Sequence, residues 1–168
     1  MVQRAEPSSL SVEPARPEDY DAIAELTVRV YVEGELASDQ YTPQLADVAG
    51  RAGRSELLVV RNADGRVVGS VACVLSGDFG EVLESDDEAA FRMLVVDPEA
   101  QGRGIGRLLV TSCLDRARAA GKTRVVISTD ARMTAAHRLY EGLGFTRVPE
   151  RDWSPLPGID LLVYAVDL

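Results

Sequence analysis

The fold is decided by the stretch Val95-Val96-Asp97-Pro98-Glu99-Ala100-Gln101-Gly102-Arg103-Gly104-Ile105-Gly106-Arg107. It ends an apolar segment and opens a helical pattern, and every second residue from Gly102 to Gly106 is a glycine. At such a turn, successive backbone N–H groups converge without side-chain obstruction, and the positive end of the helix dipole assists them. The pattern therefore predicts a strand, a loop that binds a pyrophosphate, and a helix.

Known phosphate loops differ in their spacing. A mononucleotide P-loop requires Lys followed by Ser or Thr after its last glycine, but Arg107 and Leu108 follow Gly106 here. A dinucleotide loop requires G-x-G-x-x-G directly after its strand, whereas a spacer and G-x-G-x-G follow this one. Asp130, after the next predicted strand, suits a ribose contact, so a dinucleotide-binding protein stays open as an alternative. The third possibility is a coenzyme A loop.

Periodicity and turn residues around this loop predict a mixed sheet with helices on both faces. Asp64-Gly65 is a hairpin signal that makes the first strands antiparallel, and strand, helix, strand in succession predicts a parallel pair. The predicted strands are 10–13, 57–60, 67–75, 91–96, 124–127 and 161–166, and the predicted helices begin at Pro17, Pro43, Gly104 and Thr134 and end near Val30, Arg54, Ala120 and Leu143.

Composition excludes several classes of protein. With 168 residues, of which 46% are hydrophobic and 27% charged, the chain predicts one domain spanning residues 1–168. The net charge is −9 and the arginines are scattered, so we expect no nucleic-acid partner. Cys73 and Cys113 lie in apolar segments without metal-ligand spacing. Without a signal peptide or membrane span in the sequence, the cytoplasm is the predicted location, with no membrane partner.

Two motifs together resemble the GNAT superfamily of N-acetyltransferases. Residues 101–106 match the family pattern [Q/R]-x-x-G-x-[G/A], and residues 136–145, Ala-His-Arg-Leu-Tyr-Glu-Gly-Leu-Gly-Phe, are similar to the family's A-x-x-L-Y-x-x-x-G-F. The resemblance implies a GNAT-like mixed α/β (α+β) sheet of six to seven strands, with the parallel pair at the cofactor site. It also implies an acyltransferase that uses acetyl-CoA and no metal to acetylate a primary amine.

The resemblance also assigns residues to the cofactor. In such enzymes the pantetheine arm pairs with the strand before the loop, which places it beside Leu94, Val95 and Val96, and a backbone amide near Val96 stabilises the oxyanion. The loop residues that would hold the pyrophosphate are Gln101, Gly102, Arg103, Gly104, Ile105, Gly106 and Arg107. Met133 stands where the family often has a cofactor-contacting Asn, which puts one contact in doubt.

The same resemblance suggests the catalytic and acceptor-binding residues. Tyr140 aligns with the tyrosine that protonates the departing thiolate, and Glu88 is the candidate general base, with an ordered water as the alternative. The acceptor would lie near Tyr31 and Glu33 on one side and Trp153 on the other, and carboxylates there favour a small cationic amine, with a peptide N-terminus also possible. A homodimer is possible. The non-enzyme alternative is an acyl-CoA-binding sensor that transfers nothing.

Overall fold

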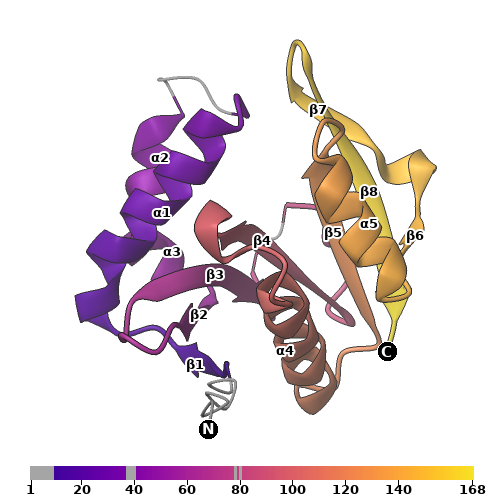
Figure 1. The fold of residues 1–168 in the computed structure, drawn as a ribbon. Helices are drawn as coiled ribbons and strands as arrows, with labels where there is room; N and C mark the ends of the chain where they lie inside the picture. The colour runs from indigo at the N-terminus through magenta and orange to yellow at the C-terminus, as the bar shows by residue number, and fades with distance from the viewer. Residues whose placement is uncertain (1–9, 37–40, 78, 80) are drawn as a thin grey trace, which may run out of the picture.

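The computed structural model describes residues 10–36, 41–77, 79 and 81–168 (Figure 1). The strands are β1 (Val12–Pro14), β2 (Glu56–Arg61), β3 (Val67–Val74), β4 (Glu88–Val96), β5 (Arg124–Asp130), β6 (Thr146–Arg147), β7 (Trp153–Leu156) and β8 (Ile159–Asp167). The helices are α1 (Tyr20–Glu33), α2 (Thr42–Ala46), α3 (Val48–Ala52), α4 (Ile105–Ala119) and α5 (Thr134–Gly142), with short 3-10 turns at Pro17–Asp19, Pro98–Ala100 and Pro149–Arg151.

One twisted sheet runs through the molecule in the order β1-β2-β3-β4-β5-β8-β6, and β7 pairs with β8. Of the strand pairs, β4 with β5 is parallel, and the others are antiparallel. The connection between β4 and β5 is α4, as a parallel pair requires. The predicted mixed α/β sheet with one parallel pair is therefore confirmed.

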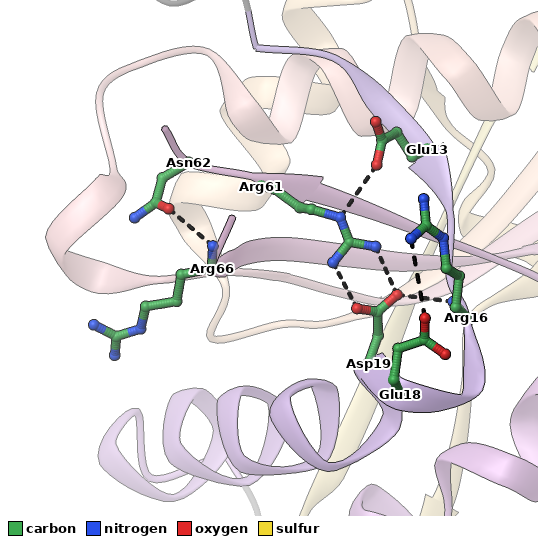
Figure 2. A network of polar contacts seen from close by, with 7 residues as sticks. All are labelled: Glu13, Arg16, Glu18, Asp19, Arg61, Asn62 and Arg66. Carbon is green, nitrogen blue, oxygen red and sulfur yellow. Dashed lines mark hydrogen bonds and ion pairs between the residues drawn. The ribbon is translucent and has the colours of Figure 1, made fainter. Parts of the chain in front are cut away.

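The early hairpin forms because its strands are apolar and its turn is polar. Every residue of β3 is buried, and so are the four central residues of β2. Between them, the side-chain oxygen of Asn62 accepts hydrogen bonds from the backbone N–H groups of Asp64 and Arg66, and Gly65 takes a positive φ of 77°. Figure 2 shows the Asn62 contact with Arg66 at this turn.

Helices cover both faces of this part of the sheet, as predicted. On one face, Ile23 and Leu26 of α1 and Val48 of α3 pack against β2, β3 and β4. On the other, Ile105, Leu109 and Cys113 of α4 share a core with the same strands and with β5. A Cβ atom on Gly69 of β3 would lie 2.6 Å from Ile105, so glycine is what allows α4 to approach the sheet this closely.

Two details differ from the sequence prediction. In the described residues the sheet has eight strands instead of six to seven, because β6 and β7 were not predicted. β6 has two residues, and β7 contains Pro155, which favours a loop in sequence but is tolerated in a strand that pairs on one side only. The helix predicted from Pro43 is split at Asp47, whose backbone leaves the helical region and whose side chain caps α3 by accepting the N–H of Gly50.

The N-terminal strand is attached to the sheet by a closed ion-pair network (Figure 2). The guanidinium of Arg61 on β2 donates to both carboxylate oxygens of Asp19, at 2.5 and 2.7 Å, and to Glu13 of β1 at 3.1 Å. Asp19 also accepts the backbone N–H of Arg16 at 2.8 Å. Each of these groups is hydrogen-bonded to another member of the network. The network therefore fixes where α1 begins relative to the sheet.

No helix in the described ranges is long and apolar enough to span a bilayer.

Candidate active site

The strands β4 and β5 pair at their beginnings and then separate. The parallel register joins Glu88 to Arg124 and Ala89 to Val125, and within the described chain the pairing goes no further. On its other side β4 remains bonded to β3 as far as Val96. From about Ala90 onward, β4 therefore has one backbone edge that no strand occupies, and an extended ligand can pair with that edge as an added strand would. Leu94 and Val96, predicted to bind the cofactor, lie on this segment, with Val95 buried between them.

The glycine loop follows directly at the end of β4. Gln101, Gly102, Arg103 and Gly104 are all exposed, and both glycines have positive φ, 82° and 77°. The first α4 hydrogen bond is from Leu108 N–H to the carbonyl of Gly104. The N–H groups of Ile105, Gly106 and Arg107 precede it, so they have no intrahelical partner and are available to a ligand.

These residues fit a diphosphate. No atom lies within 4 Å of where a Cβ would stand on Gly102 or Gly104, so the loop is open on that side. Free N–H groups at the N-terminus of a 15-residue helix favour an anion, and the exposed side chains of Arg103 and Arg107 add positive charge. Of the predicted loop residues, Ile105 alone is buried, in the core beneath the helix.

A bulge interrupts β4 just before the predicted cofactor segment. Ser70 of β3 faces Val95 and Ala72 faces Arg92, so two steps along β3 correspond to three along β4. Within the bulge, Met93 has a φ of 55°, a left-handed conformation that costs a non-glycine residue roughly 1–2 kcal/mol. A bulge turns backbone groups away from the ladder, and here it does so beside the open edge. Sequence reasoning placed the oxyanion donor near Val96 and missed Met93, for which the sequence carries no signal.

Tyr140 lies inside an aromatic cluster on the β5 side. Its ring centroid is 5.7 Å from that of Phe91 on β4, 5.8 Å from Phe145 and 6.3 Å from Tyr164 on β8. The residue is 4% exposed. Burial, with smaller contributions from Tyr31 and Cys113, raises the pKa of the Tyr140 phenol well above its ordinary value. Its hydroxyl is therefore protonated at neutral pH, and it gives up that proton less readily than an exposed tyrosine does.

Glu88, predicted as a general base, is bound by an arginine. It begins β4, at the end where the strand still pairs with β5, and it is buried. Arg151 donates to its two carboxylate oxygens at 2.9 and 3.1 Å, and the backbone N–H of Glu84 donates at 3.0 Å. Burial acts to raise the pKa of Glu88, but these hydrogen bonds outweigh burial and hold it below its usual value. A carboxylate so stabilised is a weak base, so its surroundings favour a structural role.

The predicted acceptor-binding residues lie on two separate elements, α1 and β7. Tyr31 is half-buried near the end of α1, where burial raises its pKa to about 12, and Glu33 is exposed two residues later. Trp153 begins β7 and packs against Val126, Val148 and Val163. The structure thus places Tyr31 and Glu33 on one side of the β4 edge and Trp153 on the other. Part of the predicted acceptor loop after Glu33, residues 37–40, lies outside the described residues.

Sequence reasoning missed a cavity of about 340 Å³ between α2, α3 and β4. Its lining includes Tyr41, Met93 of the bulge and the three arginines Arg51, Arg54 and Arg92. No motif in the sequence brings these arginines together, because Arg51 and Arg54 come from α3 and the turn after it, whereas Arg92 comes from β4. The cavity adjoins the open edge through Met93.

The dinucleotide alternative loses its support here. The carboxylate of Asp130 is engaged by Arg132, at 2.9 Å to Nε and 2.7 Å to Nη2. The loop also follows a strand that is antiparallel to its neighbour on one side, whereas dinucleotide domains place their loop in a largely parallel sheet.

Comparison with known proteins identifies relatives for most of the chain. The profile of the acetyltransferase (GNAT) family matches residues 20–145. N-acetylaspartate synthetase of Danio rerio is 37% identical over 95 residues, which is 56% of this chain and 31% of that protein. Mycothiol acetyltransferase of Streptosporangium roseum is 42% identical over 82 residues, covering 49% and 24%. The matched region is thus about a third or less of these relatives' own length.

Solved structures agree along nearly the whole chain. A GCN5-related N-acetyltransferase from Kribbella flavida superposes with a TM-score of 0.73 at 28% identity, covering 97% of this chain and all of that one. The structure of yncA from Salmonella typhimurium with its cofactor acetyl-CoA superposes with a TM-score of 0.68 at 24% identity, covering 96% of this chain and 95% of that one, and shows a shared fold.

Proposed function

This chain belongs to the acetyltransferase (GNAT) family, and we propose that it acetylates a primary amine by direct attack of the amine on the acetyl group of acetyl-CoA within a ternary complex. The family makes it an acyltransferase with acetyl-CoA as donor. The observation that carries the proposal is the unoccupied edge of β4, which leads from the bulge at Met93 to the glycine loop. We propose that residues 1–168 act as one catalytic domain.

Acetyl-CoA supplies an activated thioester, and the chain's own residues bind and orient it. The free backbone groups around Leu94 and Val96 can pair with the amides of the pantetheine arm. The N–H groups of Ile105, Gly106 and Arg107, aided by the helix dipole, can bind the diphosphate. Together these contacts position the reacting end of the donor near the bulge, where the acceptor cavity opens.

Two groups are suited to the chemistry at that point. The backbone freed by the bulge at Met93 can direct an N–H toward the thioester oxygen, which gains negative charge during the attack. The protonated hydroxyl of Tyr140 can return a proton to the leaving sulfur. Because a phenol has a reference pKa of about 10 and a thiol about 8.5, this transfer is already uphill, and the raised pKa of Tyr140 makes it more so, so it must be coupled to thioester cleavage.

A general base is the least supported part of the proposal. Glu88 stays a prediction, but its pairing with Arg151 argues against it. His137 is partly buried with its Nε2 3.1 Å from the carbonyl of Asp130, a contact that supports a structural role over that of a base. We therefore favour loss of the amine proton through water.

The acceptor, partners and location remain proposals. The names of two relatives, N-acetylaspartate synthetase and mycothiol acetyltransferase, favour a small molecule over a peptide N-terminus as acceptor. A cytoplasmic location rests on the buried, unpaired thiols of Cys73 and Cys113, which suit a reducing compartment. A homodimer is the one assembly that we consider, and light scattering after gel filtration tests it.

The proposal is tested by ligand-dependent thermal stability. Acetyl-CoA and coenzyme A, each at 100 times its dissociation constant, should stabilise the protein by about 2.7 kcal/mol, and NAD should not. Gly104→Glu should remove the shift because it places a side chain and a negative charge in the open loop. Gly121→Glu is the matched control, since Gly121 has nearly the same φ, 76° against 77°, and equally open surroundings.

Each result has a defined meaning. An equal shift in Gly104→Glu and wild type would overturn the loop assignment. A shift with acetyl-CoA but no acetylation of any amine would favour the acyl-CoA sensor, and a shift with NAD alone would restore the dinucleotide alternative.

A further inference from the structure

The cavity between α2, α3 and β4 carries more positive charge than its own carboxylates neutralise. Its lining contains three arginines and two acidic residues, Asp47 and Glu81. Asp47 caps α3 by accepting the N–H of Gly50 at 3.1 Å, and Glu81 forms an ion pair with Arg92 at 3.3 Å. Neither acidic residue is paired with Arg51 or Arg54.

Arg51 is the most informative of these residues. It is 2% exposed, and its Nη2 donates to the backbone carbonyl of Leu45 at 2.5 Å. Its Nη1 is buried, and among the described residues it has no hydrogen-bond partner. Desolvation is the main reason that the pKa of Arg51 falls below its ordinary value. A buried guanidinium that keeps unpaired N–H groups is costly unless something else supplies the acceptors.

The neighbouring arginines are held around the same space by an aromatic ring. The guanidinium carbons of Arg54 and Arg92 lie 4.3 and 4.6 Å from the centroid of Phe79. Arg92 is further fixed by its hydrogen bond to the carbonyl of Phe79 at 3.0 Å. In the part of the chain that the structure describes, Arg54 has no carboxylate partner either. The arrangement is positioned for a ligand that brings acceptor oxygens.

We infer that the acceptor amine carries an anionic oxygen group, a carboxylate or a phosphate, which binds in this cavity to Arg51 with help from Arg54. The inference rests on the proposed function, because Met93 links the cavity to the place where the acetyl group would lie. Arginine N–H groups bind both anions with two parallel hydrogen bonds. The cavity, at about 340 Å³, has the size of a small-metabolite site. This replaces the cationic acceptor expected from the sequence.

The test compares acceptors that differ only in the anion. Wild-type protein is assayed by coenzyme A release with the amino acids as free acids and as α-amides, and with O-phosphoethanolamine against ethanolamine. We expect kcat/KM to favour the anionic member of a pair by about 100-fold, because the neutral member leaves buried N–H groups unpaired. The free acids and O-phosphoethanolamine distinguish a carboxylate from a phosphate.

Variants then test whether Arg51 is responsible. Arg51→Met should reduce the preference to a few-fold by raising KM for the anionic acceptor, with the shift produced by acetyl-CoA unchanged. Arg51→Lys, which keeps a positive charge but lacks the planar guanidinium, should restore part of the preference for the anionic acceptor. Arg118→Met is the charge-matched control, since Arg118 is exposed on α4 and pairs with Asp115. If Arg51→Met does not fold, the exposed Arg54→Met and competition by succinate against the acceptor address the same cavity.

The outcomes separate this inference from the proposed function. Equal or better turnover of the neutral amines would overturn the anionic acceptor while acetylation stands. A preference for the anionic acceptor that is retained in the folded Arg51 and Arg54 variants would overturn the binding of the anion in this cavity. No acetyl-CoA shift and no turnover of any amine would overturn both.

Discussion

Arg61 lies on β2 and Arg51 on α3, and the surroundings of their two guanidinium groups differ. Arg61 donates to Asp19 and Glu13, and Asp19 also accepts the backbone N–H of Arg16, as Figure 2 shows. Arg51 is more deeply buried, yet the partner its guanidinium has in the described chain is one backbone carbonyl.

Because of these different surroundings, the pKa values of Arg61 and Arg51 are shifted in opposite directions from that of a free arginine. The hydrogen bond to Asp19 is the largest influence on Arg61 and raises its pKa, while desolvation is the largest influence on Arg51 and lowers it. A group whose interactions are complete within the chain contributes to stability, and a group left incomplete beside a cavity is available to a ligand. The backbone groups on the open edge of β4 and the N–H groups in the first turn of α4 are likewise available to a ligand. Substitutions in the closed network should therefore change stability, and those at the open site should change activity.

The largest effect on stability is expected for Asp19→Ala. Removing this 6% exposed carboxylate leaves Arg61 without its main partner, which should lower the free energy of unfolding by about 3 kcal/mol. Urea denaturation measures it. Asp21→Ala, the control, removes an exposed charge from the first turn of α1 and should lower the free energy of unfolding by less than about 1 kcal/mol. Both variants should still acetylate the acceptor at 25 °C. Loss of acetylation in folded Asp19→Ala would contradict the view that the closed network affects stability and only the open site affects activity.

A comparable effect, on rate and not on stability, is expected for Tyr140→Phe. The aromatic packing is kept and the proton donor removed, so kcat should fall about 100-fold, equivalent to about 2.7 kcal/mol, with the acetyl-CoA shift unchanged. Steady-state kinetics measure this. Tyr164→Phe is the control, because Tyr164 lies in the same cluster and its hydroxyl donates to Glu141 at 3.3 Å. A wild-type rate in Tyr140→Phe would remove the tyrosine from the mechanism.

A smaller effect should appear in acid. The hydrogen bond from Arg61 is the main reason that the pKa of Asp19 lies below its reference value of 3.8. A depressed folded-state pKa contributes stability that is complete above the unfolded pKa and is lost as the pH falls through the folded one. The difference in Tm between wild type and Asp19→Ala should therefore be constant above about pH 5 and should narrow below about pH 4. A difference that stays constant down to pH 2.5 would show that the pairing does not depend on ionisation.

The smallest effect is expected at the bulge. Met93→Gly relieves a positive φ of 55° and should raise stability by up to about 1 kcal/mol, offset in part by the lost side chain and the greater freedom of glycine in the unfolded chain. Leu94→Gly gains no such relief and should destabilise. Thermal unfolding of the two variants compares them. A large loss of stability in Met93→Gly would mean that its side chain, not its backbone, maintains the bulge.

Local pattern was enough for most of the fold and for proposing the cofactor-binding residues. The hairpin at Asn62–Arg66, the helix after Gly104 and the parallel pair followed from alternation, turn residues and glycine placement. β6 and β7 were not predicted, because a two-residue strand and a strand containing Pro155 show no periodic pattern in the sequence. The motif identified Tyr140, but it did not predict that the residue is buried among Phe91 of β4, Phe145 after α5 and Tyr164 of β8.

The residues that depend on distant partners could not be found from the sequence. Glu88 reads as a solvated acid in an acidic run, and only the fold brings Arg151, 63 positions later, to its carboxylate. Arg51 reads as an ordinary surface arginine at the end of a helix.

The sequence by itself determined the cofactor side of this protein, because a diphosphate loop is built from consecutive backbone N–H groups and its glycines must be neighbours in the chain. The tertiary structure alone decided the acceptor side. There the bulge at Met93 depends on the register between β3 and β4, and the charge of the cavity depends on which arginines find carboxylates. Both are properties of segments far apart in the chain, and no local pattern encodes them.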